Sequence, residues 1–255
     1  MTTTGSLAWS RRTGGTLSPI DRLRLTAQAL LTRLARWPAF ARQRSGLDDR
    51  TLGRFDTDAL PLPDSADARR ALDHAALLTP GWLYQHSLRT YLWGALLARG
   101  RGIAFDAELL LVASALHDLG LAEEPRGCDF DDACFAVHGA RAAGRFADQL
   151  GWPTERRDRL AEAISLHLNV RVGLAAGAEA HLLHAGAALD CIGARLKEIP
   201  SPLVTAVLAR HPRQGFKQRM AAALDDQATV RYASRAAFLA RLGFNRLIQA
   251  APFAE

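Results

Sequence analysis

Six residues that can bind a metal ion occur in a fixed order between positions 86 and 190 of this chain. They are His86, the adjacent pair His117 and Asp118, His138, His167 and Asp190. Imidazole nitrogens and carboxylate oxygens, without a thiolate, form a ligand set that suits zinc, iron or manganese. The adjacent pair follows the apolar run 109–116, and burying a histidine beside an aspartate is costly unless they are paired or bind a cation. The pattern therefore predicts a metal site.

Helical spacing predicts that these residues point into the interior of a helical bundle. His86 shares a helical face with Trp93, and His138 shares one with Phe135. Bundles of helices build metal sites from side chains directed inward in this way. A single histidine on an apolar face is more often a core residue satisfied by a carbonyl group. For His138 and His167 we therefore leave both interpretations open, a second metal or a core position.

Composition limits the possible classes of protein. The chain has 255 residues, of which 49% are hydrophobic and 23% charged, as expected for one large globular domain. The net charge is +6, but the arginines are scattered and aromatic residues make up 7%, so nucleic-acid binding is not expected. The three cysteines form no CxxC pair, which favours reduced thiols. We expect no signal peptide, no stable membrane insertion and a cytoplasmic protein.

Periodicity predicts an all-α fold, because alternating segments rich in β-branched residues are almost absent. Residues 1–18 are rich in Thr, Gly, Ser and Arg and suggest a flexible leader. Residues 19–65 suggest a basic amphipathic helix followed by a loop. Its apolar stripe is expected to pack on the domain, with a membrane surface as the alternative. The main domain spans 66–255, with helices expected at 66–76, 81–100, 106–119, 132–150, 155–168, 179–197, 202–210, 214–225 and 229–242.

The ordered series of ligands, with its flanking residues, resembles the HD-domain superfamily of metal-dependent hydrolases, and within it the cyanamide hydratase-type proteins. The matching stretches are Gln85–Gly94, Ala115–Gly120, Glu162–His167, Ala188–Gly193 and His211–Lys217, within a region from about residue 75 to about residue 225. The resemblance implies a single helical-bundle HD domain within 66–255, with C-terminal helices and an N-terminal helical extension.

Two positions depart from patterns in this superfamily. Phosphodiesterase branches often carry a lysine just after the His-Asp-x-Gly motif, where this chain has Leu121, so cyclic dinucleotide hydrolysis is disfavoured. His138 stands where two-metal members place an extra ligand, whereas the hydratase-type relatives generally have no histidine there. The number of bound metals, one or two, therefore stays open.

The resemblance also implies roles for single residues. The expected metal ligands are His86, His117, Asp118 and Asp190, with His138 and His167 as ligands of a possible second metal. The residues themselves add further candidates: Asp118 or His167 could shuttle the proton, and Arg89 could anchor an anionic substrate, with a surface salt bridge as the alternative. Trp93, Phe130 and Phe135 could line an apolar substrate pocket, with plain core positions as the alternative. The loop 123–132 would sit at the mouth of the site. The cofactor is a divalent transition metal, with zinc expected first and iron or manganese as alternatives.

Three functions remain in competition at this point. The first is a hydrolase or hydratase that activates water for attack on a small nitrogen compound, such as a nitrile or cyanamide. The second is a dinuclear phosphohydrolase or an iron-dependent oxygenase that uses His138 and His167. The third is a binding or sensor module without turnover. The expected partner is a small-molecule substrate, and a homo-oligomer is possible. Fold and metal ligands recur across unrelated reactions and do not name the substrate.

Overall fold

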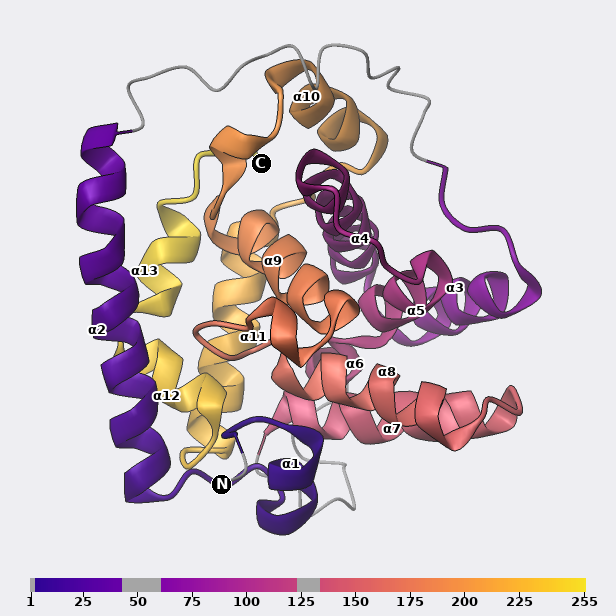
Figure 1. Ribbon diagram of the computed structural model, residues 1–255, viewed down its shortest axis with the longest axis horizontal. Coiled ribbons are helices and arrows are strands. Elements are labelled where there is room, and N and C mark those ends of the chain that lie inside the picture. The colour runs from indigo at the N-terminus through magenta and orange to yellow at the C-terminus, as the bar shows by residue number, and fades with distance from the viewer. Residues whose placement is uncertain (1–2, 43–60, 123–133) are drawn as a thin grey trace.

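The computed structural model describes residues 3–42, 61–122 and 134–255, with the backbone alone for residues 33–42. Within these ranges every regular element is a helix, so the all-α prediction is confirmed (Figure 1). The N-terminal helices are α1 (Leu7–Thr13) and α2 (Pro19–Arg42). The central helices are α3 (Ala66–Leu78), α4 (Gly81–Arg101), α5 (Ala107–Leu116), α6 (Leu119–Ala122), α7 (Phe135–Gln149), α8 (Thr154–Leu166) and α9 (Ala178–Ile192). The C-terminal helices are α10 (Ser201–Arg210), α11 (Phe216–Val230), α12 (Arg235–Arg241) and α13 (Phe244–Gln249).

The core forms around α5, whose residues 109–116 are all buried. Such a helix is apolar on every side because α3, α4, α7, α8 and α9 all pack on it. Asp106 caps its N-terminus by accepting a hydrogen bond from the amide of Leu109. A second cluster, which contains Trp9, Leu83 and Phe216, joins the two ends of the chain to this core. The predicted metal ligands lie where the two clusters meet.

Helices α4 and α9 pack closely against each other. A side chain at Gly186 would place its Cβ 2.2 Å from the carbonyl oxygen of Thr90, and one at Gly94 would lie 3.0 Å from that of Leu182. A larger residue at Gly186 would push the backbones apart, whereas one at Gly94 would require its neighbour to move by a few tenths of an ångström. This contact fixes His86 and Asp190, which lie on these two helices, relative to each other.

The segment expected to form a flexible leader contains a short helix, α1, in its described residues. Ser6 caps α1 by accepting from the Trp9 amide, and Gly14 ends the helix with a positive φ of 59°. Trp9 is 1% exposed, and the Gly5 carbonyl accepts a hydrogen bond from Ser165. The polar composition of this segment concealed it, because a helix of seven residues is too short to produce a clear period.

The expected packing of the long N-terminal helix is wrong for its described side chains. Asp21 and Leu25 are buried, but the apolar stripe on the opposite side, which includes Leu23 and Leu30, is exposed. The predicted helix 179–197 ends at Ile192, because Gly193 takes a positive φ of 66°. The predicted helix 229–242 begins at Arg235, after the cap at Ser234, while α1 and α13 were not predicted. None of the described helices is long and apolar enough to span a membrane.

Candidate metal centre

The His117–Asp118 pair lies in the tight turn that joins α5 to α6. His117 is the C-terminal cap of α5 with helical backbone angles, and the Asp118 carbonyl accepts from the amide of Leu121. Gly139 of α7 approaches this turn so closely that a Cβ there would lie 2.8 Å from the His117 carbonyl oxygen. Both side chains are buried, with exposures of 0% and 4%. The turn therefore holds them rigidly in the interior.

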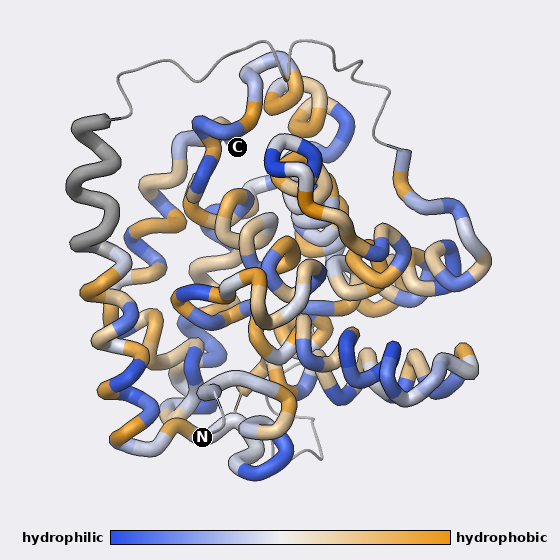
Figure 2. The backbone as a smooth tube through the Cα atoms, in the orientation of Figure 1, coloured by the Kyte–Doolittle hydropathy of each residue, from blue (hydrophilic) through white to orange (hydrophobic). Residues whose placement is uncertain are grey.

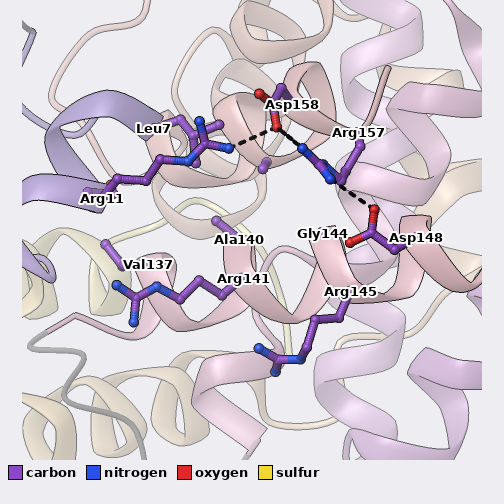
Figure 3. A pocket seen from close by; sticks show the side chains of 12 residues that line it. Leu7, Arg11, Val137, Ala140, Arg141, Gly144, Arg145, Asp148, Arg157 and Asp158 are labelled. Carbon is purple, nitrogen blue, oxygen red and sulfur yellow. Dashed lines mark hydrogen bonds and ion pairs between the residues drawn. The ribbon is translucent and has the colours of Figure 1, made fainter. Parts of the chain in front are cut away.

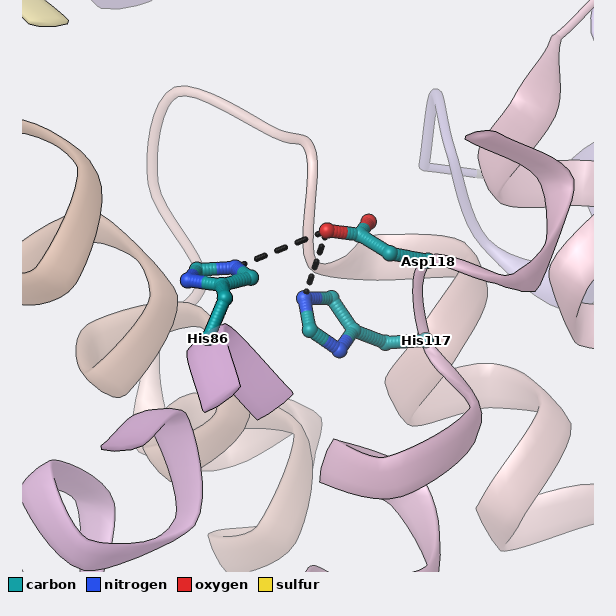
Figure 4. Close-up of side chains that lie close together, drawn as sticks. All are labelled: His86, His117 and Asp118. Atoms are coloured by element: carbon teal, nitrogen blue, oxygen red, sulfur yellow. Dashed lines mark ion pairs between the residues drawn. The ribbon is translucent and has the colours of Figure 1, made fainter. Parts of the chain in front are cut away.

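Three imidazoles direct the same nitrogen toward the Asp118 carboxylate. The Nε2 atoms of His117 and His86 lie 3.1 Å and 3.5 Å from Oδ2 (Figure 4). The Nε2 atom of His167 lies 3.5 Å from the other oxygen, Oδ1. Two atoms bound about 2.0–2.2 Å from one ion stand roughly 3.0–3.5 Å apart at octahedral to tetrahedral angles. The observed separations therefore have the size expected for ligands of a shared cation.

The other ring nitrogen of each histidine is already committed as a donor. Nδ1 of His117 lies 2.8 Å from the Ser114 carbonyl, and Nδ1 of His167 lies 2.6 Å from that of Ile164. A carbonyl oxygen only accepts, so these nitrogens carry the proton and leave Nε2 with its lone pair. In His86, Nδ1 lies 2.7 Å from Asp190 Oδ2, which fixes the same tautomer when that carboxylate is ionised.

In these tautomers the Nε2 atoms of His86, His117 and His167 and the Asp118 carboxylate are all hydrogen-bond acceptors, and none of them offers a proton to the others. His117 Nε2 is buried and has no hydrogen-bond partner among the described residues, although Asp118 lies beside it. Burial alone would raise the pKa of Asp118, but the charge of a protonated His117 and hydrogen bonds from His117, His167 and His86 hold this pKa well below its usual value, so that without a metal an imidazole must donate a proton here. Lone pairs and a carboxylate that face one another without a cation would repel. The donor set therefore fits a divalent metal, and His86, His117 and Asp118 have ligand atoms within 4.8 Å of one another.

Asp190, predicted as a fourth primary ligand, lies behind His86 in the structure. Its Oδ2 contacts His86 Nδ1, and the Arg89 guanidinium donates Nε and Nη2 to its two oxygens at 2.8 and 2.9 Å. Trp93 donates to Oδ1 at 2.9 Å, and Arg213 Nη1 lies 3.4 Å from the same oxygen. Burial would raise the pKa of Asp190, but Arg89 and His86 hold this pKa far below its usual value. These contacts orient the imidazole of His86, as an outer carboxylate does in metal sites.

The other predicted site residues are placed as follows. Arg89 is 0% exposed and binds Asp190, so in this structure it does not face a substrate. Trp93 is likewise committed to Asp190. The Phe135 ring centroid lies 5.9 Å from that of His167, so Phe135 does border the cluster. His138 is buried at the start of α7, beside Gly139, and its role stays a prediction. Phe130 and the loop 123–132 lie outside the described residues.

Two residues of this outer layer were not assigned a role from the sequence. Arg213 is 3% exposed and bridges Asp190 to Glu255, with distances of 3.4 Å and 2.9 Å. Phe216 stacks on the His86 ring at 4.8 Å between centroids and receives the Arg213 guanidinium at 4.7 Å. Both belong to the stretch His211–Lys217, which was noticed only for its resemblance to the family. An arginine in a loop gives no sequence signal for burial.

A separate pocket of about 280 Å³ opens between α1, α7 and α8 (Figure 3). Along one side, Asp158 pairs with Arg11 and Arg157 at 2.9 and 3.2 Å, and Arg157 reaches Asp148 at 3.0 Å. No predicted site residue lines this pocket. This surface pocket is therefore separate from the candidate metal centre.

Comparison with known protein families agrees with this geometry. The family model described as the HD domain matches residues 83–209, a range that contains all six predicted ligands. No curated protein matches the chain. The match, the helical bundle and the His-His-Asp cluster are mutually consistent. Residues 83–209, just under half of the chain, match the HD domain, and this match supports a place for the chain in the HD-domain superfamily of metal-dependent hydrolases.

Proposed function

We propose that this protein is a metal-dependent hydrolase or hydratase that activates water at the cluster of His86, His117 and Asp118. One observation carries the proposal: three imidazoles present Nε2 lone pairs to a single ionised carboxylate in a buried position. Such an arrangement needs a positive charge among these atoms, which a bound divalent cation supplies in place of a proton on one of the imidazoles. The HD-domain match supports the same chemistry. Zinc is the first expectation for nitrogen and oxygen ligands, with iron or manganese as alternatives.

A divalent cation in this cluster would lower the pKa of a coordinated water from about 15.7 to roughly 7. The residues of the chain then have separate tasks. His86 and His117 would hold the cation through Nε2, because Asp190 and the Ser114 carbonyl hold their Nδ1 protons. Asp118 Oδ1 and His167 Nε2 lie 3.5 Å apart and are suited to accept and return the proton. Burial lowers the pKa of His167, which keeps it neutral and able to act as a base.

The surroundings of the cluster favour a small substrate of little charge. Phe216 and Phe135 pack against the rings of His86 and His167 and give the described walls an apolar character. Both guanidinium groups in the outer layer, Arg89 and Arg213, are engaged by Asp190. They are therefore not available to neutralise a phosphate group. Together with the resemblance to cyanamide hydratase-type proteins, this supports a nitrile- or cyanamide-like compound as the substrate.

A specific observation favours a second candidate, a dinuclear phosphohydrolase or oxygenase. The two oxygens of Asp118 serve different imidazoles, since Oδ2 faces His86 and His117 whereas Oδ1 faces His167. A carboxylate divided in this way is able to bridge two cations, as in two-metal sites. His138, buried beside the turn, would complete the second position. The number of metal ions per chain distinguishes the two candidates.

The test combines metal analysis with a substrate screen. Purified protein loaded with zinc, iron or manganese is assayed against cyanamide, nitriles, phosphomonoesters and nucleotides. We expect about one metal per chain, hydration of a nitrile or cyanamide, and loss of both in H117A. The control is H74A, because His74 lies on α3 and takes no part in the cluster. Two metals per chain with phosphatase activity would favour the dinuclear candidate, and bound metal without any turnover would favour a sensor module.

A further inference from the structure

Residues 251–255 form a short segment that packs against the ends of α9 and α11. A Cβ at Gly193, the residue that caps α9, would lie 2.5 Å from the Pro252 ring. The Lys217 side chain, at the start of α11, donates to the Phe253 carbonyl at 2.7 Å. Figure 2 marks the end of this segment with the letter C, beside the chain that follows α9. The segment is therefore attached to two helices of the domain.

Arg213 lies against this segment and is almost completely buried. Its guanidinium carbon is 4.7 Å from the ring centroid of Phe216 and 4.7 Å from that of Phe253. Its Nε donates to a carboxylate oxygen of Glu255 at 2.9 Å. A buried guanidinium is stabilised by hydrogen bonds, a counter-ion and aromatic faces around it. Phe253 and Glu255 therefore supply much of the surroundings that keep Arg213 in this position.

From this position Arg213 contacts the outer layer of the metal cluster by two routes. Its Nη1 donates to the main-chain carbonyl of Asp190 at 3.2 Å and lies 3.4 Å from Oδ1 of the same residue. Its other contact, the Phe216 ring, stacks on the His86 imidazole with 4.8 Å between centroids and 28° between planes. Because Asp190 Oδ2 lies 2.7 Å from His86 Nδ1, both routes end on the same imidazole.

We propose that Arg213 is a positioning residue for the metal ligand His86, and that residues 251–255 hold Arg213 in place. The inference rests on the proposed metal centre but not on any particular substrate. Arg213 and the segment lie outside the residues that match the HD domain, 83–209. Outer groups that orient a metal-bound histidine change metal affinity by about 10–100-fold. Arg213 acts through such a group, so its loss should lower the affinity by about tenfold, at the small end of this range.

Competition with a zinc chelator, carried out on the full chain, tests the proposal. R213M removes the charge but keeps an apolar side chain between the two rings, and it should bind zinc about tenfold more weakly at unchanged stoichiometry. R213K, which keeps the charge, should bind zinc more tightly than R213M. F253A should also weaken zinc binding, because Arg213 loses one of its two rings. The matched control is F146A, which removes an equally buried ring that contacts His74 instead.

The control separates positioning from stability. F253A and F146A should both unfold at lower urea concentration than the wild type, since each leaves a cavity, but F146A should keep wild-type zinc affinity. An R213M protein that binds zinc as tightly as the wild type would overturn the inference, and this result decides even if F253A does not fold. Equal weakening in F146A would also overturn it, because the lower affinity would then follow from lower stability.

The proposed function can fail separately from this inference. A wild-type protein that binds zinc but turns over no substrate would contradict the proposed reaction alone, and the zinc affinities of the variants would still decide whether Arg213 positions His86. A wild-type protein that binds no metal at all would contradict both proposals.

Discussion

Replacing Asp190 with asparagine separates the two roles that this residue can have. In the structure Asp190 receives Arg89, Trp93 and His86 at distances of 2.7–2.9 Å, all in a position with 0% exposure. The substitution keeps the volume but removes the negative charge. One oxygen also becomes an NH₂ group that faces donors. The buried guanidiniums then lose their counter-ion, and the tautomer of His86 is no longer fixed.

The magnitude follows from these contacts. Breaking a buried, hydrogen-bonded ion pair by removing one partner costs about 3–5 kcal/mol, because a charge stays buried without compensation. Loss of an outer carboxylate on a metal-bound histidine lowers metal affinity by about 10–100-fold. We therefore expect D190N to lose about 3–5 kcal/mol of unfolding free energy and to bind metal more weakly, but still at full stoichiometry when metal is in excess.

Urea unfolding and competition with a chelator measure the two effects. The control is E255Q, which removes the other carboxylate on Arg213 but one that is 30% exposed, so it should cost less than about 1 kcal/mol. A D190N protein as stable as E255Q would refute the buried-charge argument. A folded D190N protein that binds no metal even at saturation would make Asp190 a primary ligand, as the family resemblance implies.

Three further predictions concern other parts of the molecule. G186A should destabilise the protein by about 1–3 kcal/mol in thermal melts, because its Cβ would meet the Thr90 backbone, whereas G144A on α7 meets nothing within 4 Å and should be neutral or stabilising. Burial lowers the pKa of His211 to about 4. As the pH falls below the ordinary pKa of histidine, this residue is therefore protonated first in the unfolded chain, which destabilises the folded protein. Between pH 7 and pH 5, H211Q should therefore lose about 2 kcal/mol less unfolding free energy than the wild type in urea titrations. An unchanged dependence of the unfolding free energy on pH would contradict the burial argument. H138N should leave one equivalent of metal bound if His138 is not a ligand, and a loss of one equivalent in elemental analysis would assign it to a second metal.

Local patterns were sufficient to predict most of the fold. Apolar periodicity located the central helices, because each buries one face or, in α5, its whole surface. The ends were harder to predict, since they depend on single conformations such as the positive φ of Gly193. Helix α1 was not predicted, because Trp9 is buried by contacts with residues that are distant in the sequence. The orientation of α2 was wrong for a related reason: periodicity identifies an apolar stripe but does not say whether it faces the core.

The candidate site shows the same division between residue type and placement. His86, His117 and Asp118 were identified from their order in the sequence, and they come together in the structure. The engagement of Arg89 and the position of Asp190 behind His86 were not foreseen. Both depend on the angle at which α4 meets α9, which is fixed by the contact of Gly186 with Thr90. Sequence spacing contains no such information.

The most direct test of the metal centre is an anomalous difference map from a crystal grown with zinc. We expect a peak about 2.0–2.2 Å from Nε2 of His86, Nε2 of His117 and an oxygen of Asp118. A second peak less than about 4 Å away, near His167, would indicate the dinuclear form of the same centre. A map without a peak among these three side chains, from protein that binds zinc in solution, would contradict the central claim.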